Sequence, residues 1–241
     1  SGTVAEVTIV GTLEGQTKTV ITGGRTFRNA FQMRSTAYSI SGGSGIGTAI
    51  CDGQAPATNF TDVGAGGVHT NDINCLAALQ ITTGTSATTY SPLQAVSRWQ
   101  MAIFLVRTAT ALGVAVPAPV PQGFGDLGGL GQQAVDAINQ VKQLGITAGT
   151  SSNTYGPHEN VSRWQMALFL TRLYTAAGAS LPAGGAGFSD LAGLSPEAVT
   201  AINQLAALQV STGTGGGNFS PTTVVTREQM ASFLARLIRL L

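Results

Sequence analysis

The chain has 241 residues, of which only 10% are charged, and its formal net charge at pH 7 is +1. It lacks the basic surface that nucleic-acid binding requires and any apolar run long enough to cross a membrane, so neither a nucleic acid nor a membrane span is expected. The 32 glycines and the many Thr, Ser and Asn residues fit an extracellular surface protein. The low charge and the 43% hydrophobic content favour self-association, because little electrostatic repulsion keeps copies of the chain apart.

The first 40 residues are predicted to be a β-rich segment. Apolar and polar residues alternate on both sides of a turn at Glu14-Gly15-Gln16, which is the pattern of two strands. Residues 41–59, with Gly42-Gly43-Ser44-Gly45, are expected to be a linker. Because an isolated hairpin is marginally stable and has open edges, residues 1–40 either pack on the rest of the chain or complete a sheet in a neighbouring copy.

Residues 22–40 contain three short motifs: Thr22-Gly23, Phe27-Arg28 and Met33-Arg34-Ser35-Thr36. They resemble the C-terminal end of the sporulation stage II protein D / amidase-enhancer domain, from which the chain departs at Ala37. The resemblance implies that residues 1–40 are the tail of a wall-degrading domain whose catalytic portion lies outside this chain.

From residue 60 onward, one pattern occurs three times. Each copy has a Phe-x-Asp motif, then a glycine after Ile or Val, an aromatic-x-Pro motif, and an arginine that begins a helix. Three copies in register predict three similar structural units that bury a shared core. The landmarks are Phe60, Phe124 and Phe188; Gly84, Gly149 and Gly213; Tyr90, Tyr155 and Phe219; and Arg98, Arg163 and Arg227.

Each copy is predicted to fold as helix, loop, helix. In the third copy, Ser195 is a good N-cap and Pro196 suits the first helical position, and apolar residues follow at helical spacing. Spacers rich in Ala, Pro and Gly separate the copies. The copies are expected at 60–113, 124–178 and 188–241, with second helices at about 98–112, 163–177 and 227–240.

This pattern resembles the S-layer homology domain, whose repeats carry the same landmarks in the same order. The resemblance covers about residues 60–241. It implies a mainly α fold, in which three repeats form a pseudo-threefold bundle after the β-rich segment. It also implies non-covalent attachment of an extracellular protein to bacterial cell-wall polysaccharide at the cell surface. Ligand contacts would fall on Arg98, Arg163, Arg227, Gly84, Gly149 and Gly213.

The arginines need an explanation beyond helix capping. The Ser or Thr before each arginine and the Gln after it form a capping box, as in Ser97 and Gln100. A cation at the first helical position is unfavourable by about 0.3–1 kcal/mol. Two interpretations stay open: an internal carboxylate pairs with each arginine, or an external anion binds there. The candidate internal partners are Asp62, Asp126 and Asp190.

Two further features separate these copies from the family pattern. Trp99 and Trp164 follow the arginines where the family has Ala, and they are either stacking platforms for sugar rings or packing groups between repeats. The Trp that the family often has near the start of its first helix is missing from all three copies.

A second arginine nine residues after each landmark arginine is expected to make a helix-surface or inter-repeat contact.

The two cysteines, Cys51 and Cys75, are predicted to form a disulfide. The positions equivalent to Cys75 in the other copies are Gln140 and Gln204, so the repeat does not need a cysteine there. A disulfide would join the N-terminal part of the chain to the first repeat, contribute about 3 kcal/mol by loop closure and indicate an oxidising compartment.

Catalysis has little support in the sequence. His69 and His158 occupy unrelated repeat positions, without the spacing of metal ligands or of a nucleophile with its base. We therefore expect no enzyme, no metal and no cofactor. Two functions remain: a cell-wall anchor that binds polysaccharide, or a self-assembling subunit of a surface layer or filament.

Overall fold

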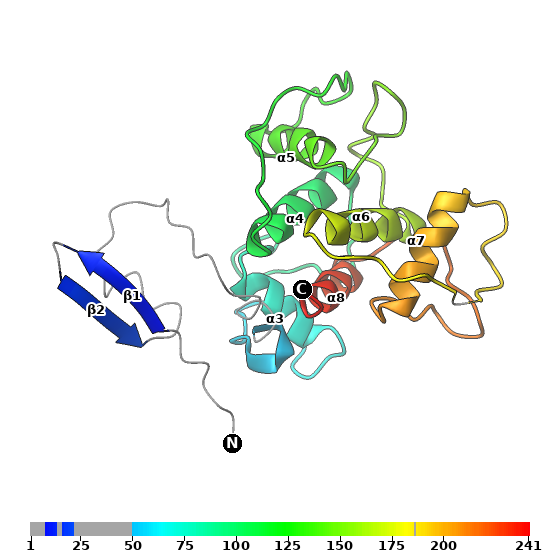
Figure 1. The fold of residues 1–241 in the computed structure, drawn as a ribbon. Helices are drawn as coiled ribbons and strands as arrows, with labels where there is room; N and C mark the ends of the chain where they lie inside the picture. Colours follow the sequence, from blue (N-terminus) through cyan, green and yellow to red (C-terminus); the bar gives the residue numbers. More distant parts are fainter. Residues whose placement is uncertain (1–7, 14–15, 22–49, 186) are drawn as a thin grey trace. The chain divides into compact units, whose positions relative to one another are not determined.

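A computed structural model describes residues 8–13, 16–21, 50–185 and 187–241 and divides the chain into two units, 1–43 and 44–241. In the first unit, strands β1 (Thr8–Leu13) and β2 (Gln16–Ile21) form an antiparallel hairpin (Figure 1). The motifs at 22–40, and the Glu14-Gly15 half of the predicted turn, lie outside the described residues.

The elements of the second unit are helices joined by loops, in the part of it that the structure describes. The predicted second helices begin at the expected arginines and end one or two residues earlier than expected. No helix in the described ranges is long and apolar enough to cross a membrane. The elements are a short π-helix η1 (Ile50–Gln54) and the α-helices α3 (Thr70–Ala78), α4 (Arg98–Ala111), α5 (Gln132–Gln143), α6 (Arg163–Ala176), α7 (Pro196–Ala207) and α8 (Arg227–Ile238).

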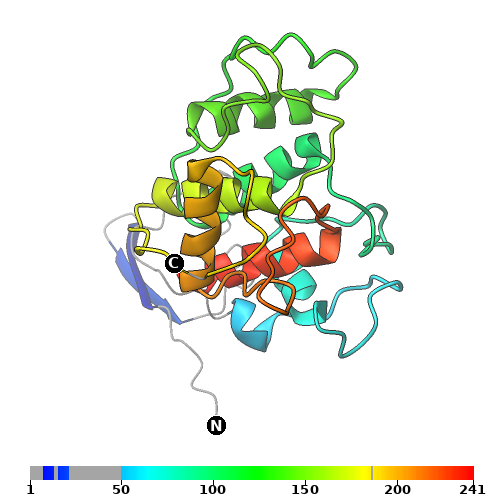
Figure 2. The same ribbon diagram turned by 90° about the vertical axis from the view of Figure 1, so that its right-hand side faces the viewer.

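The helices pack in a cyclic order. Helix α4 packs on α5, and α6 packs on α7, so the second helix of one copy contacts the first helix of the next. Helix α8 of the third copy then packs on α3 of the first copy. Figures 1 and 2 show α4, α6 and α8 near one another, with α3, α5 and α7 around them.

Three valines form a closed ring of backbone hydrogen bonds inside this arrangement. The N–H of Val96 donates to the carbonyl of Val225 at 3.0 Å, the N–H of Val225 to that of Val161 at 2.9 Å, and the N–H of Val161 to that of Val96 at 2.9 Å. All three side chains are fully buried. Each copy therefore supplies one donor and one acceptor to a contact that needs all three.

Capping explains why the central helices begin where they do. Helices α4, α6 and α8 have the predicted capping boxes, in which the glutamine side chain accepts a bond from the N-cap N–H. The distances are 3.0 Å from Ser97 to Gln100, 3.0 Å from Ser162 to Gln165, and 3.3 Å from Thr226 to Gln229.

Candidate functional site

The landmark arginines are buried between consecutive copies. Arg98, Arg163 and Arg227 are only 3%, 6% and 3% exposed. The Nε of each donates a hydrogen bond to the carbonyl of the aromatic landmark in the next copy. The acceptors are Tyr155 for Arg98 at 2.7 Å, Phe219 for Arg163 at 2.8 Å, and Tyr90 for Arg227 at 2.7 Å.

Each guanidinium also lies over two aromatic rings of that next copy. The guanidinium carbon of Arg227, for example, is 4.7 Å from the ring centre of Tyr90 and 5.5 Å from that of Phe104 on α4. Such cation–π contacts strengthen when water is excluded. Burial lowers the pKa of Arg163 and Arg227 from the ordinary arginine value. The corresponding ring pairs are Tyr155 and Phe169 for Arg98, and Phe219 and Phe233 for Arg163.

Two tyrosines return a hydrogen bond across the same contact. The Tyr90 hydroxyl donates to the carbonyl of Arg227 at 2.8 Å, and the Tyr155 hydroxyl to that of Arg98 at 3.0 Å. Burial raises the pKa of both hydroxyls, so they remain donors. At the contact between the second and third copies, Phe219 takes the place of the tyrosine. It has no hydroxyl, so this contact lacks the hydrogen bond.

The landmark aspartates bind backbone instead of pairing directly with the arginines. The Asp62 carboxylate accepts from the N–H groups of Tyr90 at 2.8 Å and Ser91 at 2.7 Å, in its own copy. Asp126 and Asp190 hold the equivalent loops of their copies in the same way. The ion pairs within 4.0 Å among the described residues include none between these aspartates and the landmark arginines.

An electrostatic coupling between aspartates and arginines remains, and it crosses from one copy to the next. Burial raises the pKa of Asp62 and Asp126, but the backbone hydrogen bonds outweigh it, and the pKa of both lies below the ordinary value. For Asp190 the hydrogen bond from the Phe219 N–H is the main cause of a lowered pKa. Arg227 acts on Asp62, Arg98 on Asp126 and Arg163 on Asp190, each lowering the pKa of the carboxyl group.

These aspartates are expected to make the fold sensitive to acid. A carboxyl whose folded pKa lies below the unfolded value of about 4 stabilises the fold fully above that value, and this stabilisation is lost as the pH falls through the folded pKa. Asp190→Asn should therefore lower the melting temperature at pH 7. The difference in melting temperature between this variant and the parent protein should shrink towards pH 2. Thermal melts across this range measure it, with Asp136→Asn on α5 as control. A difference that stays constant with pH would contradict the argument.

The landmark glycines have a structural reason that the sequence pattern alone does not reveal. Gly84, Gly149 and Gly213 have φ of +79°, +90° and +85°. A Cβ at Gly84 would lie 2.6 Å from the ring of Phe60 and 2.6 Å from the carbonyl oxygen of Thr89, and the other two sites are equally crowded. Steric demands alone account for glycine here, so the ligand role implied by the family resemblance is not required to explain it.

Trp99 and Trp164 make backbone contacts between consecutive copies. Both side chains are half-buried against the hydrophobic core. Their backbone N–H groups donate to the carbonyls of Pro157 and Pro221 in the next copy, each at 3.0 Å. The third copy makes the same backbone contact from Glu228 to Pro92. The contact therefore does not depend on tryptophan.

The second arginines stabilise loops within their own copies. Arg107, Arg172 and Arg236 donate to the carbonyls of Ile81, Ile146 and Val210, at 3.2, 3.1 and 3.1 Å. Arg172 additionally forms an ion pair with Glu197 on α7 at 2.6 Å. These residues thus brace the loop that carries each landmark glycine.

A cavity of about 540 Å³ lies between α6 and α7. Leu144, Leu168 and Leu181 give it apolar walls, and Arg172 with Glu197 supplies charge. The Arg172 side chain is 26% exposed, in contrast to the buried landmark arginines. Accessible polar groups also come from Thr175, Thr200 and Gln204.

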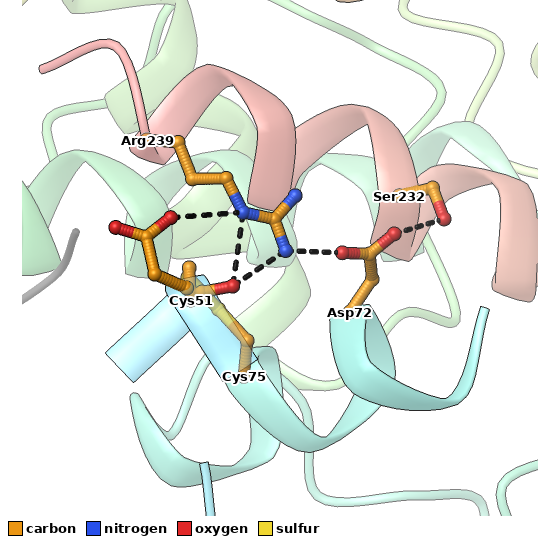
Figure 3. Close-up of a disulfide and its surroundings, with 6 residues drawn as sticks. Cys51, Asp72, Cys75, Ser232 and Arg239 are labelled. Carbon is orange, nitrogen blue, oxygen red and sulfur yellow. Dashed lines mark hydrogen bonds and ion pairs between the residues drawn. A yellow bond between two sulfur atoms is a disulfide. The ribbon is translucent and has the colours of Figure 1, made fainter. Parts of the chain in front are cut away.

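The predicted disulfide is present between Cys51 and Cys75, with the two Cα atoms 4.8 Å apart (Figure 3). It joins η1 to α3. In the described part of the chain no cluster of three His, Cys, Asp or Glu residues could hold a metal ion.

Sequence reasoning missed several residues that recur in register. Asn74 and Asn139 follow an isoleucine in α3 and α5, and their side chains accept bonds from the N–H groups of Thr58 and Gln122, two residues before the Phe landmarks. The repeated Ile-Asn pair, which occurs again at Ile202-Asn203, would have identified them. Asp72, Ser232 and Arg239 were also missed; each departs from the repeat pattern, and a comparison of the three copies at these positions would have identified them.

Comparisons with known proteins place part of this chain. Residues 123–167 and 187–231 match the S-layer homology domain. An endoglucanase from Bacillus sp. (strain KSM-635) is 31% identical over 161 residues, which is 66% of this chain but only 16% of that protein. The two matched segments include α5, α7 and the landmark arginines Arg163 and Arg227.

Proposed function

We propose that residues 60–241 form three S-layer homology repeats around a pseudo-threefold axis that attach an extracellular protein to bacterial cell-wall polysaccharide. The two family matches support the second and third repeats. The first copy is supported by its contacts, because Arg227 binds Tyr90 as Arg98 binds Tyr155 and Arg163 binds Phe219. The ring of valines would lie on the axis.

The cavity between α6 and α7 is the single observation that carries the binding role. The Arg172 guanidinium is 26% exposed, and an acidic sugar substituent would compete with Glu197 for it; the hydroxyl and amide groups of the cavity suit sugar hydroxyls. The landmark arginines are buried too deeply to serve as the first contact, and none of them lines the cavity; their contacts join consecutive copies instead. The function requires no catalysis in this chain, and endoglucanase activity belongs to the relative, of which the chain spans 16%.

The test is sedimentation with purified cell-wall sacculi. The protein should pellet with sacculi that retain their polysaccharide and stay in solution with sacculi stripped of it. Arg172→Gln should weaken binding by at least about tenfold, because a charge-assisted hydrogen bond contributes about 1.5–3 kcal/mol and about 1.4 kcal/mol is a factor of ten. Arg107→Gln is the matched control, since Arg107 makes the same loop contact through the Ile81 carbonyl but lines no part of the cavity.

Two outcomes would overturn this proposal. Equal binding to intact and stripped sacculi would exclude the polysaccharide as ligand. Sedimentation of the protein alone, without sacculi, would favour the self-assembling subunit instead. If Arg172→Gln and Arg107→Gln bind equally well while the parent protein still requires polysaccharide, the attachment function stands and the α6–α7 cavity is not its site.

A further inference from the structure

The contact between α3 and α8 differs in chemistry from the two equivalent helix contacts. At four positions it has polar or charged residues, and the other copies are apolar there or carry threonine. His69 and Asp72 on the α3 side correspond to Ala134 and Ala137 on α5. Ser232 and Arg239 on the α8 side correspond to Leu168 and Thr175 on α6. On α7, the residues equivalent to His69 and Asp72 are Ala198 and Ala201. On α4, the residues equivalent to Ser232 and Arg239 are Ile103 and Thr110.

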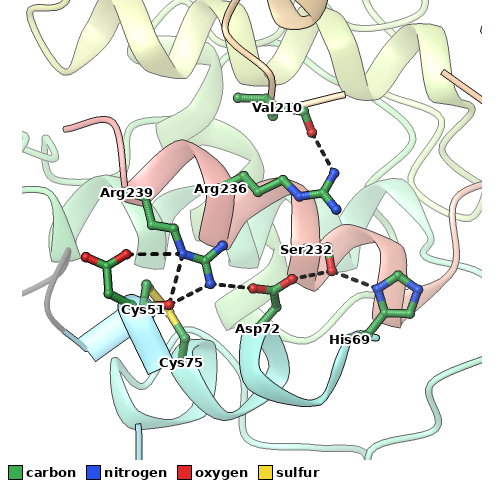
Figure 4. A network of polar contacts seen from close by, with 9 residues as sticks. Cys51, His69, Asp72, Cys75, Val210, Ser232, Arg236 and Arg239 are labelled. Atoms are coloured by element: carbon green, nitrogen blue, oxygen red, sulfur yellow. Dashed lines mark hydrogen bonds and ion pairs between the residues drawn. A yellow bond between two sulfur atoms is a disulfide. The ribbon is translucent and has the colours of Figure 1, made fainter. Parts of the chain in front are cut away.

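These four side chains form one hydrogen-bonded chain (Figure 4). Arg239 Nη2 lies 2.6 Å from Asp72 Oδ1, the Ser232 hydroxyl donates to Asp72 Oδ2 at 2.5 Å, and His69 Nδ1 lies 2.7 Å from the Ser232 oxygen. Asp72 and Ser232 are buried, at 7% and 3% exposure. Because a buried carboxylate without partners is strongly destabilising, the members of this chain depend on one another.

The ends of both helices favour the same pairing. Asp72 lies in the first turn of α3, where the helix dipole stabilises a negative charge. Arg239 is the C-cap residue of α8, where the dipole stabilises a positive charge. The ion pair therefore joins the start of one helix to the end of the other with both charges in favourable positions.

The disulfide lies beside this pairing. Arg239 donates from Nε and Nη2 to the carbonyl of Cys51, at 2.9 and 2.5 Å, and Cys51 is bonded to Cys75 on α3 (Figure 3). Asp52 is a further, longer partner of Arg239 at 3.7 Å. One arginine of the last helix thus contacts both η1 and α3.

Topology explains why this helix contact differs. Helices α4 and α5, like α6 and α7, follow each other along the chain, so the connecting segment keeps them close. Helices α3 and α8 lie at opposite ends of the three copies, and bringing them together requires the loop-closure entropy of the whole intervening chain. Helix α3 is also shorter, with 9 residues against 12 in α5 and α7, and offers less apolar contact.

We propose that the Cys51–Cys75 disulfide and the Arg239–Asp72–Ser232–His69 chain act together as a clamp that closes the ring of copies. The clamp joins η1 and α3, the first two helices of this unit that the structure describes, to α8, the last one. It compensates for the short α3 and for the closure of distant segments. The other two helix contacts close without it. The inference holds whether or not the protein binds polysaccharide.

Hydrogen exchange of the full oxidised chain, followed by mass spectrometry, tests the clamp. In Arg239→Met, amides of residues 70–78 should exchange at least about tenfold faster, as expected for local opening, while 132–143 and 196–207 keep the parent rate. Arg172→Met is the matched control, because it removes an arginine that pairs with a carboxylate at the same 2.6 Å across the α6–α7 contact. We expect no comparable acceleration of α7.

Adding Cys51→Ala and Cys75→Ala to Arg239→Met should bring α3 close to unprotected rates, with α5 and α7 still protected. The milder variant Asp72→Asn should reproduce the pattern of Arg239→Met if the latter folds poorly. Uniform acceleration of all helices, or equal local effects of Arg239→Met and Arg172→Met, would show that this contact is an ordinary one and would overturn the clamp. So would unchanged exchange of α3 in Arg239→Met.

Discussion

Gly213→Ala is expected to lower the free energy of unfolding by about 3–5 kcal/mol, which is a large part of the stability of a typical domain. The residue has φ of +85°, and a Cβ would lie 2.5 Å from the carbonyl oxygen of Asn218 and 2.7 Å from the Phe188 ring. The backbone cannot relax easily, because the Asp190 carboxylate holds the adjacent Phe219 and Ser220 N–H groups. Urea denaturation, monitored by circular dichroism, measures the loss.

Gly178→Ala separates the two causes of this loss. Gly178 has φ of +84°, but a Cβ added there would meet no atom within 4 Å. Only the unfavourable backbone conformation should matter, and about 1–2 kcal/mol is expected. If both variants lose the same free energy, the close packing of the landmark glycine against the Phe ring is not what requires glycine.

Arg227→Met is expected to destabilise the protein by about 3–5 kcal/mol, since it leaves the buried Tyr90 carbonyl without its donor and removes two buried cation–π contacts. The substitution removes the bond to the Tyr90 carbonyl and the cation–π contacts with Tyr90 and Phe104, at the contact between the third and first copies. Methionine fills similar volume, so the loss reports mainly the guanidinium. The same denaturation experiment measures it.

Arg236→Met provides the comparison on the same helix. Arg236 is half-buried and donates one hydrogen bond, to the Val210 carbonyl, so a loss of about 1 kcal/mol is expected. A smaller effect of Arg227→Met than of Arg236→Met would show that the landmark arginine is not a structural element. Because Arg227→Met weakens the fold, a loss of polysaccharide binding in that variant would not identify Arg227 as a ligand contact.

The amino-acid sequence was sufficient to predict the structural features that depend on local chemistry. The positions of the central helices followed from the capping boxes at Ser97, Ser162 and Thr226, and the disulfide followed from a cysteine that one copy alone carries. The partners of the arginines could not be obtained in this way. A cation at a helix start requires some compensation, but the sequence does not say whether a carboxylate, a carbonyl or an aromatic ring provides it.

The partners of the landmark arginines are set by the cyclic packing of the copies. It brings Arg98 to Tyr155 of the following copy, and not to an aspartate of the copy to which Arg98 belongs. The clamp residues were accessible in principle. Comparison of the three copies exposed Cys75 as a departure, and the same comparison at His69 and Asp72, against alanine in both other copies, would have exposed the rest.

The ring formed by Val96, Val161 and Val225 also constrains how the protein reaches its fold. A nascent chain that has emerged only as far as the second copy can form the bond from Val161 to Val96, but the Val96 N–H has no acceptor until Val225 is made. The first two copies therefore cannot complete this ring of hydrogen bonds until the third copy has been made. The same dependence restricts evolution by repeat loss, because deletion of any one copy breaks two of the three bonds at once.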